Sequence, residues 1–377
     1  MQIVLHEIKK ILNWKILCLI TLVNIIFYFF MLDFEIKYFP NGFSAVSSYQ
    51  LGLQMIEKYG TVIDEQEFAD FKQTYQQRVK DAGDYLKARE ESAALGMTDY
   101  QKFRAAASSE DEDQRELNIQ LFFTENIDIF WELQVRESLI EFYEHRKEDV
   151  PKPTSQAADR RIQELVKQDQ LRMFPEVSLM NYIDFISSVM IIVVISVCLV
   201  ITPIFVRDRK ENICELQYAA KVGRPLFKYK IMAGISAACI VITGLLAVYF
   251  SLYRQNEPGL YLNVTINRFG DYSWYSPTFL QYIFLTIVVI YLLGCIFALL
   301  TMSFSILLSH YIALIAIQIP FIAVVIALGL HYFMAALISI VFPQWLMPVV
   351  FLALLLASSL LLVVLWRREK KMDLLLK

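Results

Sequence analysis

The sequence predicts an all-α integral membrane protein with six transmembrane helices, an N-terminal interfacial helix and a mostly helical extracytoplasmic domain between the first and second spans. Hydrophobic residues make up 56% of the 377 residues and only 19% are charged, which is unlike a soluble domain. Residues 272–366 contain no Asp, Glu, Lys or Arg. Residues 33–180, in contrast, hold 29 acidic and 18 basic side chains, so this segment belongs in water.

The six spans follow from the length of the apolar stretches. About 20 apolar residues are needed to cross ~30 Å of hydrocarbon, because unpaired backbone amides are costly in lipid. The stretches that meet or approach this length are residues 16–32, 185–206, 231–253, 279–308, 311–330 and 345–366. No small-residue cleavage site follows the first stretch, so a retained anchor is expected there instead of a signal peptide.

Residues 331–344 are apolar but too short to cross the bilayer. They are expected to form a re-entrant or interfacial helix pair that is broken near Pro343. The alternative is a longer, tilted span with a loose loop.

Basic residues give the orientation of the spans, because Lys and Arg gather on the cytoplasmic side. The loop 207–230 holds seven of them, and residues 1–15 and 367–371 hold further clusters. Both termini and this loop are therefore expected inside the cell, with residues 33–180 outside. The expected location is the cytoplasmic membrane of a bacterial cell.

The segment 33–180 is long enough to form its own domain. Two series of apolar residues at helical spacing predict amphipathic helices with one buried stripe each. They are Phe68, Phe71, Tyr75, Val79, Ala82 and Leu86, and Ile127, Trp131, Val135, Leu139 and Phe142. This domain either shapes an exit and meets the substrate or a partner, or is a solvated helical cap.

Within the spans, polar residues are few. Asn24, Gln318 and His310 are expected to form hydrogen bonds between helices, and Pro320 is expected to kink the fifth span. No His-Glu-x-x-His, Walker loop or paired-cysteine metal motif occurs in the sequence. The expectation is a chain without catalytic residues, bound metal or bound cofactor, and without nucleic acid as a partner.

The inner loop carries the most specific pattern. In the stretch from Arg207 to Ile231, apolar residues near 213–220 share one helical face, Gly223 can stop a helix and Pro225 prevents its continuation. A short helix lying across the inner membrane surface is therefore predicted. The start of the chain, MQIVLHEIKKILNWK (residues 1–15), reads as an amphipathic interfacial helix.

This arrangement resembles the permeases of type-2 ABC transporters. In that family the first inner loop has an acidic residue, a helix with a small-residue, Arg, apolar and basic ending, and a Lys that opens the third span. Pro225 departs from the usual residue and leaves the register open. The resemblance covers about 230 residues of the membrane portion and implies a coupling helix that binds an ATPase. The residues it assigns to coupling are Glu211, Ile213, Glu215, Leu216, Tyr218, Ala219, Lys221, Gly223 and Arg224.

The resemblance implies the permease subunit of an ATP-driven exporter, in which ATP and Mg²⁺ are bound by a separate ATPase subunit. A second permease copy or a paralogous permease is the other expected partner, because six spans are too few to enclose a transport path. The charge-free spans favour a hydrophobic or amphipathic cargo such as a lipid, an antibiotic or a peptide. The alternative is a membrane-bound sensor or immunity protein with an extracytoplasmic ligand-binding domain.

Overall fold

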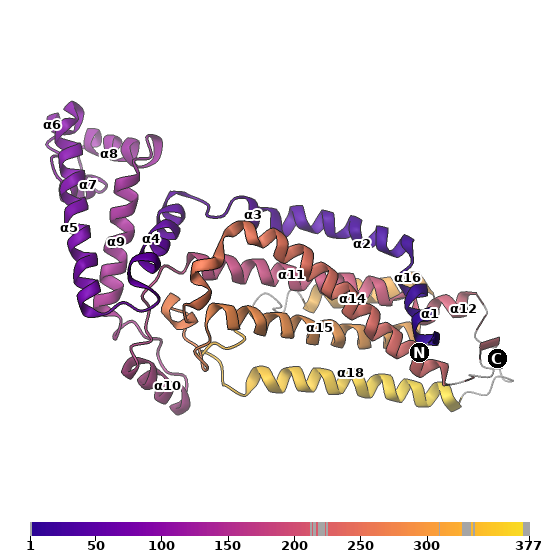
Figure 1. Cartoon of the computed structure of the whole chain (residues 1–377). Coiled ribbons are helices and arrows are strands. Elements are labelled where there is room, and N and C mark those ends of the chain that lie inside the picture. Colours follow the sequence, from indigo (N-terminus) through magenta and orange to yellow (C-terminus); the bar gives the residue numbers. More distant parts are fainter. Residues whose placement is uncertain are drawn as a thin grey trace. The chain divides into compact units, whose positions relative to one another are not determined.

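The computed structural model describes residues 2–211, 213, 216–217, 223, 225–308, 310–325, 333–334 and 336–371. Within these ranges the chain is all-helical and contains no β-strand; isolated bridges, such as that between Thr265 and Thr278, are the nearest approach to one. The chain divides into two compact units (Figure 1). The first unit comprises Met1–Tyr38, Asn181–Asn256 and Gln281–Lys377, and the second comprises Phe39–Met180 and Glu257–Leu280. The all-α class predicted from the sequence is therefore confirmed for the described residues.

The helices of the first unit are mostly long and apolar. Their bounds are α1 Gln2–Ile11, α2 Trp14–Phe27, η1 Tyr28–Leu32, α3 Asp33–Lys37, α11 Val177–Ile201, α12 Pro203–Lys210, α14 Leu226–Tyr253, η3 Arg254–Asn256, α15 Phe279–Leu307, α16 Tyr311–Val325 and α18 Leu346–Lys371. Helix α11 begins in the second unit and continues into the first.

Five helical segments among the described residues are long and apolar enough to cross a membrane. They are Trp14–Lys37, Val177–Lys210, Leu226–Asn256, Phe279–Leu307 and Leu346–Arg368. Each overlaps one of the predicted spans. This is the character of a multi-pass membrane protein, as the composition predicted.

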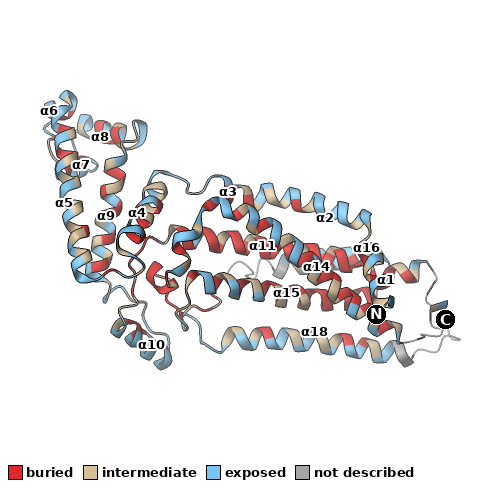
Figure 2. Ribbon diagram, viewed as in Figure 1, coloured by how far each residue is buried: buried red, intermediate tan, exposed pale blue. Residues whose placement is uncertain are grey.

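Burial separates the central helix from the peripheral ones. In the most apolar part of Val177–Lys210, 83% of the residues are buried, against 11% in Trp14–Lys37 and 22% in Leu346–Arg368. Figure 2 shows the same contrast between α11, which is mostly red, and the pale α2 and α18. Helix α11 is thus the core of the first unit, whereas α2 and α18 present apolar faces suited to lipid.

The predicted span 311–330 is described only in part. Helix α16 covers Tyr311–Val325 and contains Pro320, and residues 326–330 lie outside the described residues. Much of the predicted re-entrant segment 331–344 also lies outside them; residues 336–342 form turns without a helix. The sixth span and the re-entrant pair therefore stay predictions.

Buried polar side chains connect the apolar helices, as predicted for two of three residues. Asn24 on α2 donates to Ser196 Oγ on α11 (2.9 Å) and accepts from the hydroxyl of Tyr249 on α14 (2.7 Å). Gln318 on α16 accepts from Thr202 (3.0 Å). For His310, the described residues show no such hydrogen bond. In lipid these bonds hold helices together, because an unpaired polar group has no water to bind.

The second unit is built from shorter, amphipathic helices. They are α4 Phe43–Tyr59, α5 Glu65–Ala88, α6 Glu90–Ala94, α7 Tyr100–Ala106, α8 Glu112–Ile119, η2 Gln120–Thr124, α9 Asp128–His145, α10 Gln156–Lys167, η4 Pro258–Asn263 and η5 Ile266–Phe269. The two predicted stripes lie on α5 and α9, which pack against each other. A capping box between Asp64 and Glu67 starts α5.

Residues 257–280, most of which lie between the predicted spans 231–253 and 279–308, fold into the second unit. The carbonyl of Arg268 accepts hydrogen bonds from the backbone of Met173 (2.8 Å) and Phe174 (2.9 Å). Tyr261 is fully buried and its hydroxyl donates to the carbonyl of Tyr49 (3.0 Å). The second unit is therefore assembled from two segments that are far apart in the chain.

A carboxyl group in this second segment predicts a pH-dependent stability. Burial, with the nearby charge of Glu176, raises the pKa of Asp271 to about 6 from its ordinary 3.8. The folded protein thus binds this proton more tightly than the unfolded chain, so stability is lost as the pH rises through 6. We expect Asp271→Asn to raise the free energy of unfolding by about 1–2 kcal/mol at pH 8 and to change it little at pH 4.

Thermal unfolding of the purified chain at both pH values measures this effect. The matched control is Asp84→Asn, which changes an exposed carboxylate of the same unit. Among the described residues, this carboxylate has one ion-pair contact, at 3.6 Å from Lys87. Equal stabilisation by Asp271→Asn at pH 4 and pH 8 would contradict the assignment.

Candidate functional site

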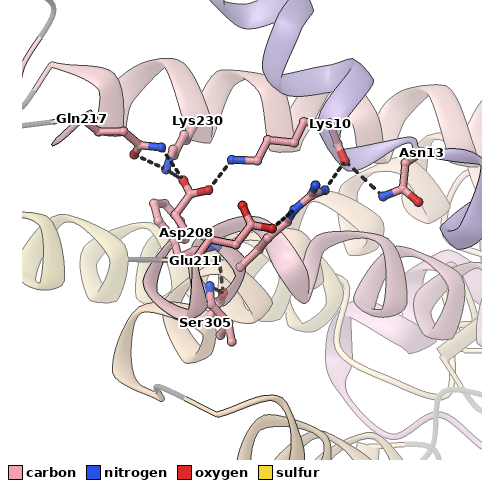
Figure 3. Close-up of polar contacts among 10 residues, drawn as sticks. Lys10, Asn13, Asp208, Glu211, Gln217, Lys230 and Ser305 are labelled. Carbon is pink, nitrogen blue, oxygen red and sulfur yellow. Dashed lines mark hydrogen bonds and ion pairs between the residues drawn. The ribbon is translucent and has the colours of Figure 1, made fainter. Parts of the chain in front are cut away.

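A buried ionic cluster lies at the base of the loop 207–230. The carboxylate of Asp208, on α12, accepts hydrogen bonds from Lys10 on α1, from Lys230 on α14 and from Gln217 in the loop (Figure 3). The Asp208 side chain is 1% exposed and that of Lys230 is 6% exposed. We call Lys10, Asp208, Gln217 and Lys230 the Asp208 cluster.

The amide of Gln217 completes the hydrogen bonding inside the cluster. Its Nε2 donates to Asp208 Oδ2 (3.1 Å) and its Oε1 accepts from Lys230 Nζ (3.0 Å). One side chain of the loop thus contacts both members of the most deeply buried ion pair. Charge-assisted hydrogen bonds in a water-poor site are strong, so the loop base is held to α12 and α14.

Helix α1 reaches the cluster because of the turn that follows it. Asn13 caps α2 by accepting from the backbone of Ile16 (3.1 Å), and its amide donates to the carbonyl of Lys10 (3.2 Å). Arg207 donates to the same carbonyl (3.4 Å) and pairs with Glu211 (3.0 Å). Helix α1 also packs along α14. The predicted interfacial helix is therefore fastened to the end of the bundle that carries the loop 207–230.

Proline shapes the α11–α12 junction that carries Asp208. Pro203 begins α12 after Thr202 and interrupts the regular helical ladder. Ser305 on α15 accepts from the backbone of Phe205 (3.2 Å) and Val206 (3.3 Å), and donates to the carbonyl of Thr202 (3.0 Å). A single hydroxyl thus satisfies backbone groups that a straight helix would pair internally.

Arg209 fixes the other side of α12. Its guanidinium donates to the carbonyls of Ile306 and Leu308 at the end of α15, where helix carbonyls have no intrahelical partner. Helix α12 is therefore tied to α1, α14 and α15 at once. A force applied to the loop would be transmitted to all of them rather than absorbed locally.

The structure describes four of the nine residues that the sequence assigned to coupling. Glu211 pairs with Arg207, Ile213 is half-buried, and Leu216 is helical with 72% of its surface exposed. Gly223 has a φ of 55°, the left-handed conformation expected of a helix stop. The other five lie outside the described residues: Glu215, Tyr218, Ala219, Lys221 and Arg224. The predicted coupling helix as a whole therefore stays a prediction.

The Asp208 cluster itself was not predicted. The sequence counted Lys10 and Lys230 only as topology markers or as the start of a span, and gave Asp208 no role. One available signal was a single carboxylate flanked by Arg207, Arg209 and Lys210 at the end of an apolar stretch. Such a carboxylate, placed next to hydrocarbon, needs a partner.

No protein-family model, curated protein sequence or solved structure matches this chain. The fold and the cluster are therefore interpreted on their own geometry.

Proposed function

We propose that this chain is the membrane-spanning permease subunit of an ATP-driven exporter of the type-2 ABC class. It would have six spans, with residues 33–180 as an outer insert and both termini inside the cell. A separate ATPase subunit, binding ATP and Mg²⁺, would supply the energy, and a second permease copy or a paralogous one would complete the path. The cargo would be hydrophobic or amphipathic, because the spans carry so little charge.

The observation that carries this proposal is the contrast between two adjacent residues of the loop, the held Gln217 and the exposed Leu216. The base of the loop is fastened by Asp208 and Gln217 to buried groups on α1 and α14. The backbone N–H of Gln217 donates to the carbonyl of Ile213, four residues earlier in the chain. The neighbouring residue, Leu216, exposes its apolar side chain. An exposed leucine on a firmly held cytoplasmic segment is the kind of group that an interface buries.

The mechanism follows from this rigidity. Two ATPase subunits that close on ATP would move their grooves together and displace the inner loops seated in them. Because α12 is bonded to α1, α14 and α15, the displacement would tilt these helices as one body. Rigid-body rocking of helices is an established way to alternate between inward and outward states.

The test is co-purification in mild detergent from native membranes. A Walker-motif ATPase should accompany the tagged chain at near-equal amount, and Leu216→Asp should remove at least nine-tenths of it, because a carboxylate cannot enter an apolar groove unpaired. The matched control is Val62→Asp, which places the same charge at an exposed apolar site in the second unit.

The control should leave the ATPase bound. Recovery of no Walker-motif subunit, or loss of the subunit in both variants alike, would contradict the proposal. A co-purifying kinase would favour the sensor function, for which the cavity described next is the supporting observation.

A further inference from the structure

A cavity of about 310 Å³ lies within the second unit, between α4 and the start of α9. Phe43, Ser47, Gln50 and Gln54 line it from α4, where their spacing of three to four residues places them on one helical face. Asn126 and Asp128 line it from the α9 side. The volume is at the lower end of the range for small-molecule sites.

Asn126, which lines the cavity, carries a buried acceptor. Its Oδ1 is buried and has no hydrogen-bond partner among the described residues. Its backbone has a φ of 51°, a conformation that costs free energy in a residue with a side chain. A buried carbonyl oxygen without a donor costs about 1–3 kcal/mol, which a hydrogen-bond donor would recover.

The net charge of the cavity lining comes from Asp128. The other lining carboxylate, Glu132, accepts from Arg78 (2.6 Å) and Arg136 (2.7 Å), and Arg78 also lies 3.6 Å from Asp81. The positive charges of Arg78 and Arg136 therefore cancel the negative charges of Glu132 and Asp81. Asp128 begins α9 and is exposed, and the residues that the structure describes offer it no ion-pair partner, so it contributes a negative charge.

An aromatic ring forms a further wall of the cavity. Phe43 is 40% exposed, and its ring is supported by Trp131, whose centroid lies 5.8 Å away. A supported, accessible ring face attracts cations and stacks on apolar groups.

We propose that this cavity binds an organic cation, in which an ammonium or guanidinium group is carried next to an apolar group. The cationic group donates to the carboxylate of Asp128, and the apolar group packs on Phe43. A rotation of the Asn126 side chain that turns its buried Oδ1 into the cavity gives the cationic group a second acceptor. An anion would meet the charge of Asp128, and a neutral alcohol would supply one donor without the charge–charge attraction. This proposal does not depend on the transport function.

Three probes of one shape test the chemistry: phenethylamine, 2-phenylethanol and phenylacetate. Calorimetric titration of the full chain in detergent should show saturable binding of the amine, at least ten-fold weaker binding of the alcohol, and no binding of the acid. Acetyl-Phe-Lys-amide, with its ammonium on a peptide side chain, identifies the source of the group: tighter binding than phenethylamine indicates a peptide ligand, and weaker binding indicates a free amine.

The variants locate the site. Asp128→Asn should weaken amine binding about ten-fold or more, because a charge-assisted hydrogen bond becomes a neutral one. Asp113→Asn is the matched control, since Asp113 is also an exposed acid in the first turn of a helix of the same unit, and it should leave binding unchanged. Ser47→Phe, which fills the cavity without changing its charge, should also abolish binding.

The thermal midpoint of each variant shows whether the chain is folded, so a misfolded variant is not scored. Equal binding of the amine and the acid would overturn the proposal. Amine binding that survives both Asp128→Asn and Ser47→Phe would overturn it as well, because the bound amine would then lie elsewhere.

Discussion

Replacement of Asp208 by alanine should lower the free energy of unfolding by about 3–5 kcal/mol, the largest effect expected in the first unit. The carboxylate is 1% exposed and pairs with the ammonium groups of both Lys10 and Lys230. Its removal leaves the Lys230 charge, only 6% exposed, next to apolar helices without a counter-ion. Unfolding of the purified chain by heat or by SDS titration measures the loss.

A double variant separates the loss of the charge balance from the loss of packing. Asp208→Leu with Lys230→Met removes both members of this buried ion pair and puts apolar side chains in their place, so part of the stability should return. Glu211→Ala breaks the ion pair with Arg207, whose members are 43% and 37% exposed, and should cost at most about 1 kcal/mol. The role given to Asp208 fails if Asp208→Ala is no more destabilising than Glu211→Ala.

The same double variant also bears on the proposed function. A permease whose loop is held only by apolar packing would keep its fold but lose the bond from Gln217 to Asp208 and Lys230. ATP hydrolysis that stays high but no longer responds to cargo would then assign the cluster to force transmission.

Much of the fold could be predicted from local pattern, because lipid and water impose their demands residue by residue. The apolar stretches marked five helices of membrane length, and helical spacing marked α5 and α9 before any contact was known. Helix α4 was missed, although Gly42 and Gly60 bracket it with φ values of 89° and 81°. These glycines were a usable signal for its two ends.

The sites could not be predicted in the same way, because they depend on contacts between distant residues. Lys10 and Asp208 are 198 positions apart in the chain. A lysine near the end of a span is equally typical of a residue that only sets the orientation of the span in the membrane. The cavity likewise needs α4 beside α9, a pairing that the stripe on either helix alone does not specify. Asn126 carries no unusual neighbours in the sequence, and only its backbone conformation distinguishes it.

The second unit joins residues 39–180 with residues 257–280. The second large loss of stability is therefore expected when Tyr261, which lies at this junction, is replaced. This side chain is fully buried against Tyr49 and Phe269, and its hydroxyl donates to the carbonyl of Tyr49. Tyr261→Ala should therefore destabilise the chain by about 3–5 kcal/mol, through the cavity left behind and the carbonyl left without its donor. Unfolding of the full chain, followed by circular dichroism, measures this loss.

Gly52 provides the sharper test of this contact, because a Cβ there would overlap the hydroxyl of Tyr261 and lie 3.2 Å from its ring carbon Cζ. Gly52→Ala alone should cost about 1–3 kcal/mol from overpacking. Adding Tyr261→Phe removes the overlapping oxygen, so the double variant should be more stable than the sum of the two single losses predicts. Strict additivity would mean that the segment 257–280 does not pack on α4, and that the second unit is held together in another way.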